Sequence, residues 1–204
     1  MTDAETNLVI GTTELPANEV EHDETDLNIP EVIEFFKLNA AALRAGREAC
    51  LARHNEKRAL HLNTDPMTLD INITRDAQNW AEKIARGEVT GYDPDTICGE
   101  NISLIPFSSA LQYLTQGDYV GVAELVVDNW YSQVSNYNFA HHTMTDPNGA
   151  KVSSFVQTIW KNSTLLGVGI TLKPDFSEVI VVCRYFQKGN IEGNRPQQVG
   201  QLKP

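Results

Sequence analysis

The sequence predicts an α+β fold, a layered domain in which helices cover an antiparallel sheet. Two patterns along the chain lead to this prediction. Apolar residues recur at helical spacing up to about Asn138. Beyond that point, short segments rich in β-branched and aromatic residues alternate with polar turn residues. Helices followed by a cluster of strands are typical of α+β domains, so the two patterns together indicate the class.

Four segments carry the helical pattern. The clearest one places Trp80 on its apolar face and stops at Gly87, a residue type that favours helix ends. The first segment contains Gly46, which we expect to be a weak point. The stretch from Gly87 to Ser109 is expected to be irregular. The expected helices run from Glu31 to about His61, from Ile73 to Ile84, around Ser109 to Thr115, and from Val122 to about Asn138.

Three segments near the carboxyl end carry the strand pattern. Polar runs separate them, and these runs predict hairpin-like turns. Gly167 and Gly169 flank Val168 inside the second segment, where we expect them to mark a bulge or close packing rather than a phosphate site. The expected strands are Val152 to Trp160, Leu166 to Leu172 and Glu178 to Phe186.

Composition and charge exclude several classes of protein. The chain has 204 residues, of which 41% are hydrophobic and 21% charged, a mix typical of one globular domain. Its net charge of −11 argues against a protein that follows a nucleic-acid backbone and against loose adsorption to anionic lipid. No apolar run approaches the ~20 residues that cross a bilayer, and neither end offers a lipidation motif. We therefore expect no nucleic-acid partner, no transmembrane segment and no lipid anchor.

The acidic residues are unevenly distributed, and this divides the chain into three parts. Residues 1–30 hold eight acidic residues and no basic one, so we expect a solvated, disordered arm there. Residues 31–191 are nearly balanced in charge and contain all the predicted helices and strands. Residues 192–204 are expected to form a polar carboxyl-terminal extension.

Cys50, Cys98 and Cys183 are an odd number of cysteines at long spacings. No two of them are placed as in a zinc ribbon or a redox dithiol motif. This usage favours a reducing compartment with free thiols, while one disulfide with one free thiol stays open as the alternative.

The histidines give two candidate groups. His54 and His61 lie seven residues apart on one helix face, too far apart to hold one ion by themselves, so we expect packing or capping roles. His141 and His142 are adjacent in a loop after the Trp130 helix. We expect a solvated pair there, because neighbouring side chains in an extended loop point apart.

A set of motifs, in order over about residues 35–191, resembles the CAP superfamily of cysteine-rich secretory proteins, antigen 5 and plant pathogenesis-related proteins. The later motifs are most similar to the Golgi-associated branch of that family. The motifs are Cys50-Leu51 with His54-Asn55, Arg58 and His61; Ala77-Gln78-Asn79-Trp80-Ala81; Cys98-Gly99-Glu100-Asn101; Asn129-Trp130-Tyr131-Ser132-Gln133; Phe155-Val156-Gln157-Thr158-Ile159-Trp160; Gly167-Val168-Gly169; and Arg184-Tyr185-Phe186 with Gly189-Asn190.

The resemblance implies a three-layer α-β-α sandwich with a small antiparallel sheet. It also implies a cleft in which two histidines and two glutamates bind a divalent metal such as zinc. Glu100 is the one retained member of this set. Gln133 stands where the family has its other glutamate, Ser154 stands where it has one histidine, and no histidine occurs near Glu88 to supply the second. We therefore expect a degenerate cleft, no catalytic residue beyond the retained position of Glu100, and no cofactor.

Two functions follow from the resemblance. The first is a non-enzymatic binding or interaction module for a lipid or protein partner. Its binding loop would begin at Tyr137 and Phe139 and continue through His141 and His142, in the place of the family's sterol-binding loop. The alternative is a metal-dependent hydrolase that uses Glu100 with a zinc site rebuilt from the two histidines.

The resemblance further implies a homodimer and an intracellular, cytoplasmic or Golgi-associated location. An extracellular location stays open if a signal segment precedes the given sequence.

Overall fold

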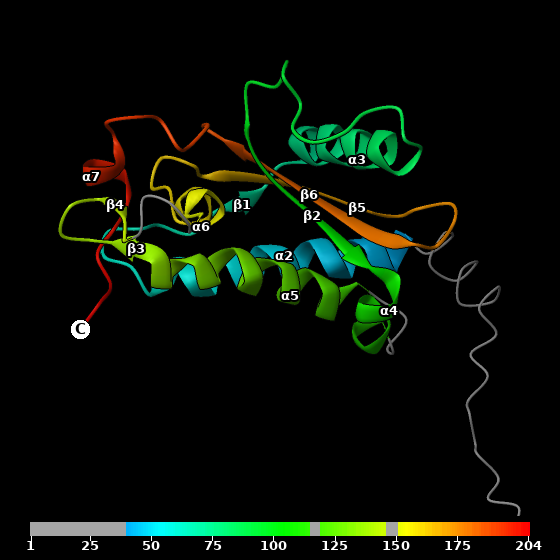
Figure 1. Ribbon diagram of the computed structural model, residues 1–204, viewed down its shortest axis with the longest axis horizontal. Coiled ribbons are helices and arrows are strands. Elements are labelled where there is room, and N and C mark those ends of the chain that lie inside the picture. Colours follow the sequence, from blue (N-terminus) through cyan, green and yellow to red (C-terminus); the bar gives the residue numbers. More distant parts are fainter. Residues whose placement is uncertain (1–39, 115–118, 146–150) are drawn as a thin grey trace, which may run out of the picture.

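A four-stranded sheet forms the centre of the computed structural model, which describes residues 40–114, 119–145 and 151–204. Its strand order is β1-β5-β6-β2, and Figure 1 shows the long strands crossing the middle of the molecule. β5 and β6 form an antiparallel hairpin, β2 pairs antiparallel with β6, and the short β1 pairs parallel with β5. The strands are β1 (Thr68–Leu69), β2 (Gly99–Pro106), β5 (Leu165–Leu172) and β6 (Glu178–Phe186).

Helices cover both faces of this sheet. α3 (Ile71–Ala85) lies on one face, whereas α2 (Ala40–Ala59) and α5 (Val120–Ser132) lie on the other together with α6 (Ser153–Thr158) (Figure 1). This is the predicted α-β-α sandwich, with a sheet that is antiparallel except for its short edge strand. The remaining elements are α4 (Phe107–Ala110), η1 (Leu111–Tyr113), η2 (Gln133–Asn136), β3 (Tyr137–Asn138), β4 (Thr143–Met144) and α7 (Arg195–Gln198).

Two glycines let α3 lie directly on β5. A Cβ atom at Gly169 would lie 2.4 Å from the carbonyl oxygen of Ala77, and one at Gly167 would lie 2.3 Å from the carbonyl carbon of Ile73. Both distances are far shorter than van der Waals contact, so only glycine permits this approach. The predicted close packing is confirmed. Trp80 also lies in the core as predicted, with 8% of its surface exposed.

The first helix departs from expectation at Gly46. Ala40–Ala59 is one continuous helix, and a Cβ atom at Gly46 would lie 2.6 Å from the Cβ of Tyr119. Gly46 therefore does not interrupt the helix, and its lack of a side chain lets the helix lie close to Tyr119. The part of this prediction that precedes Ala40, like the acidic arm, lies outside the described residues.

Two segments have a different secondary structure from the predicted one. Val152 to Trp160, expected as a strand, contains α6, whose last four residues are all buried. A run of consecutive buried residues in a short helix resembles that of a buried strand, so the sequence pattern could not separate them. Gly99–Pro106, expected to be irregular, is β2. Its buried positions include Gly99 and Asn101 instead of apolar residues, so the strand alternation is hidden.

Residues 192–204, the expected carboxyl-terminal extension, contact the domain at two positions. Val199 is 2% exposed and forms a backbone bridge with Trp160, while Leu202 forms one with His61. Within this segment, the Gln198 carbonyl at the end of α7 accepts from the N–H of Lys161, just after the end of α6. None of the helices in residues 40–114, 119–145 and 151–204 combines the length and apolar character needed to cross a bilayer.

His54 and His61 are buried, each between a carbonyl and a tyrosine, as expected of structural residues. Nδ1 of His54 donates to the Cys50 carbonyl at 2.8 Å, and its Nε2 accepts from the Tyr185 hydroxyl at 2.8 Å. Nδ1 of His61 donates to the Gly200 carbonyl at 2.8 Å, and its Nε2 accepts from the Tyr131 hydroxyl at 2.9 Å. A carbonyl can only accept, so it fixes the Nδ1-protonated tautomer of each ring.

Arg58 is a fully buried cation that is bound by backbone carbonyls. Its guanidinium donates to the carbonyl oxygens of Asp65 at 2.7 Å, Thr158 at 3.1 Å and Trp160 at 3.0 Å. Burial lowers the pKa of Arg58 to about 10, which still leaves the side chain charged at neutral pH. The guanidinium thus joins the end of α2 to the end of α6.

We predict that Arg58→Met lowers the free energy of unfolding by about 3 kcal/mol or more, because it leaves several buried carbonyls without a donor. Urea unfolding followed by circular dichroism measures the change. Arg75→Met is the matched control: Arg75 is exposed on α3, and the control should change stability by no more than about 0.5 kcal/mol. Equal effects of the two substitutions would contradict the role given to Arg58.

We also predict that His61 makes the fold sensitive to mild acid. Burial lowers the pKa of His61 below its usual 6.5, so the unfolded chain binds the proton more readily. The stabilisation is complete above pH 6.5 and is lost as the pH falls below that value. Between pH 7.5 and 5.5, urea unfolding should show a loss of stability that His61→Asn does not show. An unchanged pH dependence in the variant would exclude this role.

Candidate functional site

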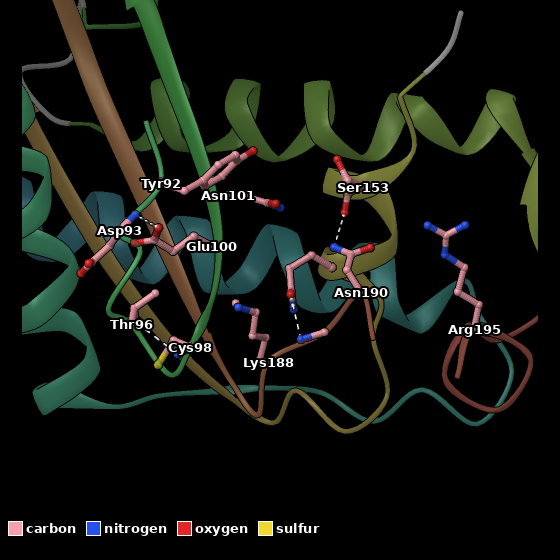
Figure 2. A pocket seen from close by; sticks show the side chains of 13 residues that line it. Tyr92, Asp93, Thr96, Cys98, Glu100, Asn101, Ser153, Lys188, Asn190 and Arg195 are labelled. Carbon is pink, nitrogen blue, oxygen red and sulfur yellow. Dashed lines mark hydrogen bonds between the residues drawn. The ribbon is translucent and has the colours of Figure 1, made fainter. Parts of the chain in front are cut away.

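A cleft of about 400 Å³ lies where β2, α6 and the chain after β6 meet. Figure 2 shows its lining, in which Lys188 and Asn190 face Glu100 and Asn101 across the opening. Gly189 lies close to α6: its N–H donates to Oε1 of Gln157 at 2.9 Å, and a Cβ there would lie 2.7 Å from the same oxygen. The residues around the opening are Tyr92, Glu100, Asn101, Lys188, Asn190 and Arg195.

Glu100, the retained cleft residue, is held by the protein itself. Its Oε1 accepts from Nε of Arg184 at 2.8 Å, and its Oε2 accepts from the backbone N–H of Asp93 at 2.8 Å. Arg184 also pairs with the Asp93 carboxylate at 2.5 Å, and its guanidinium lies 5.7 Å from the centre of the Trp80 ring. Only 2% of the Glu100 side chain is exposed. Both carboxylate oxygens of Glu100 are therefore occupied by donors of the chain.

Gln133 and Ser154 are brought together at the start of α6. Oε1 of Gln133 accepts from the backbone N–H groups of Ser154 at 3.1 Å and Phe155 at 3.3 Å. These N–H groups belong to the first turn of the helix and have no acceptor within it. Nδ2 of Asn101 donates to the Ser154 carbonyl at 3.1 Å. Gln133 and Ser154 thus lie beside the cleft without lining it, and Asn101, the neighbour of Glu100 in the chain, links them to the lining.

The predicted binding loop is divided between core and surface. Tyr137 is buried, with its ring centre 4.9 Å from that of Phe139 and 5.4 Å from that of Phe155, and burial raises the pKa of Tyr137 to about 12. Phe139 is half-buried against the same cluster. His142 is half-buried and its Nδ1 lies 3.1 Å from the Tyr137 hydroxyl, while His141 is exposed. The two aromatic residues anchor the loop, and the two histidines lie at its surface.

The two histidines line a second cavity, which adjoins the first. Asn190 and Arg195 line both cavities and so stand between the histidine pair and the cleft. The sequence did not mark these two residues or Lys188 as members of a site. Lys188 and Arg195 carried no motif, and the only signal near them was Gly189-Asn190 at the end of the family pattern.

The charges around the cleft fall into two groups. Asp93 and Glu100 are paired with Arg184. In contrast, Lys188 is exposed, Arg195 is half-buried, and neither forms an ion pair with another residue in the described ranges. Nδ2 of Asn190 donates to the Ser153 carbonyl at 2.9 Å, but its buried Oδ1 has no hydrogen-bond partner. Unpaired cations and an unfilled acceptor therefore lie on one side of the cleft.

The donor set of this cleft does not suit the metal of the family's cleft. Glu100 is already bound on both oxygens, and the Gln133 amide oxygen caps α6. Across the part of the chain that the structure describes, no three or more His, Cys, Asp or Glu side chains are grouped so that they could hold a metal ion. Zinc prefers thiolate, imidazole and carboxylate ligands, and this cleft offers no free set of them.

Comparisons with known proteins agree with this architecture. The chain is 33% identical to the human "Golgi-associated plant pathogenesis-related protein 1" over 144 residues. This alignment covers 69% of this chain and 82% of that protein. It is 31% identical to "Pathogenesis-related leaf protein 6" of Solanum lycopersicum over 146 residues. This alignment covers 72% of this chain and 80% of that protein.

Solved structures share the fold at lower identity. Schistosoma mansoni venom allergen-like protein 4 matches with a TM-score of 0.57 at 17% identity, covering 78% of this chain and 96% of that one. The crystal structure of NaASP2 with Zn²⁺ matches with a TM-score of 0.59 at 20% identity, covering 78% of this chain and 86% of that one. The family model described as "CAP: Cysteine-rich secretory protein family" matches residues 51–185. The motifs, the sandwich and these comparisons agree, and the chain belongs to the CAP family.

Proposed function

We propose that this protein is a non-enzymatic binding module whose cleft receives an anionic group of its lipid or protein partner. One observation carries the proposal. The ionisable residue retained from the family's cleft, Glu100, is engaged on both oxygens, whereas Lys188 and Arg195 on the opposite side have no ion-pair partner within the described residues.

The state of Glu100 argues against a hydrolase. General acid–base catalysis needs a group that can exchange a proton with the substrate, and it commonly needs a second group whose pKa differs. Glu100 is bound by Arg184 and by a backbone N–H. Gln133 and Ser154 do not ionise near neutral pH, and the Gln133 amide oxygen is used to cap α6.

The opposite side of the cleft favours binding of an anion. Guanidinium and ammonium groups bind carboxylate and phosphate by charge-assisted hydrogen bonds. Arg195 and Lys188 offer both groups at one opening, in a chain whose net charge is −11. Oδ1 of Asn190 adds an acceptor for a hydroxyl or N–H beside the anionic group. A small polar site with two cations binds such a group without any chemical step.

We also propose an intracellular, Golgi-associated location. The similarity to the human Golgi-associated protein supports it, and so does the odd number of cysteines at long spacings. An extracellular location is the alternative.

We predict that zinc does not bind this cleft. Isothermal titration of zinc into chelator-stripped protein should show no site tighter than about millimolar, which corresponds to about −4 kcal/mol. The same titration is made on Glu100→Gln and on the double variant His141→Ala/His142→Ala, with circular dichroism to confirm folding. Micromolar binding that both variants lose would contradict the binding-module proposal and support the hydrolase alternative.

We predict that the cleft binds inorganic phosphate and acetate weakly. Titration followed by ¹⁵N-NMR should move the backbone amides of Gly189 and Asn190, and Lys188→Ala/Arg195→Ala should weaken binding about tenfold or more. The matched control is Arg44→Ala/Arg75→Ala, which removes the same charge at exposed positions outside the cleft and should leave binding unchanged. Equal loss in both double variants would show a general charge effect and overturn the assignment.

Vesicles then separate the two sources of the anionic group. A lipid partner predicts flotation with vesicles that contain phosphatidylserine, but not with pure phosphatidylcholine vesicles, and loss of flotation in Lys188→Ala/Arg195→Ala. Phosphate binding without any flotation assigns the cleft to a carboxylate or phosphate group of a protein.

A further inference from the structure

Two thiols from distant parts of the chain lie side by side in the core. Cys50 is on α2 and Cys183 is on β6, 133 positions later in the sequence. Their Sγ atoms are 3.5 Å apart, and neither residue has any exposed surface. Cys98 lies apart from them, at the cleft, beside Thr96.

The surroundings of Cys183 leave Cys50 as its thiol neighbour. In the sheet, Cys183 is in register with Val168 on β5 and with Asn101 on β2, so the neighbouring strands place no thiol beside it. His54, one turn after Cys50, is hydrogen-bonded to Tyr185, which lies two residues after Cys183 on the same face of β6.

The distance between the two sulfurs is that of two thiols in contact, from which a disulfide bond can form. A disulfide needs an S–S distance of about 2.05 Å, so the sulfurs must approach by about 1.5 Å. The hydrogen bond between His54 and Tyr185 fixes the separation of α2 and β6 directly beside the pair. Rotation of the two cysteine side chains can therefore supply the approach without sliding the helix along the sheet.

We infer that Cys50 and Cys183 form a disulfide when the chain folds in the presence of a small-molecule disulfide oxidant such as oxidised glutathione. Because both sulfurs are buried in the folded protein, the oxidant reaches them before α2 packs against the sheet. This inference is independent of the ligand of the cleft.

The reaction is two successive thiol–disulfide exchanges. A thiolate of the pair attacks one sulfur of the oxidant, a mixed disulfide forms, and one small thiolate leaves. The second protein thiolate then attacks the protein sulfur of the mixed disulfide, and the second small thiolate leaves. Two protein thiols are oxidised, one small disulfide is reduced to two thiols, and the two protons go to solvent or to the departing thiolates.

The bond would join the first described helix to the last strand of the central sheet. The closed loop contains α3, β2, α5, α6 and β5, which is most of the domain. A crosslink across so long a loop removes much conformational freedom from the unfolded chain, so we expect Tm to rise by roughly 10 °C. In a reducing compartment the same residues stay a buried thiol pair, so their state in cells reports the compartment.

The test uses the full chain. The protein is unfolded in urea with dithiothreitol, then refolded either in a glutathione redox buffer or in dithiothreitol. We expect the oxidised sample to lose 2 Da, to keep one thiol that reacts with Ellman's reagent in urea, and to give a tryptic peptide pair that joins Cys50 to Cys183. Its Tm should exceed that of the reduced sample by roughly 10 °C.

Cys98→Ala is the matched control, because it removes the third thiol and should keep the disulfide and the rise in Tm. Cys50→Ala and Cys183→Ala should each abolish both. Three reactive thiols after oxidative refolding to the native fold would overturn the inference, and so would a disulfide that includes Cys98. The peptide map of the unmodified chain decides the question even where a variant fails to fold.

Discussion

The buried guanidinium of Arg58 is the interaction on which the arrangement of this domain most depends. It satisfies the carbonyls of Thr158 and Trp160 at the end of α6 and that of Asp65 in the chain leading to β1. The carbonyls that leave a helix end carry partial negative charge, so they offset the charge of the cation without a carboxylate. A single side chain of α2 thereby fixes the position of α6, a helix too short to be stable alone.

The position of α6 in turn sets the cleft. Its first turn is capped by Gln133 and its Gln157 side chain binds both Gly189 and Ser163, so the helix holds the chain after β6 at the rim. The ends of this helix are therefore satisfied by side chains from other parts of the domain. Gln157, which lines the cleft, is thus also used in holding the fold.

The sequence predicts the parts of the fold that have one clear period. α3 is amphipathic and starts at Asp70, whose carboxylate caps it, and the β5–β6 hairpin consists of β-branched runs around a polar turn. α6 is missed because its last four residues are buried in succession, and β2 is missed because glycine and asparagine occupy buried positions, so neither shows its period. Their assignment depends on tertiary contacts that no local pattern contains.

The candidate site shows the same limit. The motif identifies Glu100, but its partner Arg184 comes from another strand, and their pairing needs the register of β2 against β6. Arg195 reaches the cleft because residues 192–204 turn back and bridge to Trp160 and His61, whereas Lys188 and Asn190 flank Gly189, which Gln157 binds. The polar composition of residues 192–204 does not show where this segment packs.

What the cleft can bind depends on the side chains that do not already form bonds within the protein. Glu100 needs no metal to balance its charge, because Arg184 lies against one of its oxygens and a backbone N–H against the other. A metal would have to displace these bonds, and the neighbouring Gln133 oxygen would have to leave the helix that it caps. Among the described residues, no ion pair engages Lys188 or Arg195, and no hydrogen bond engages Oδ1 of Asn190. The groups that remain free to bind a ligand, among the described residues, therefore lie on the side of the cleft opposite Glu100.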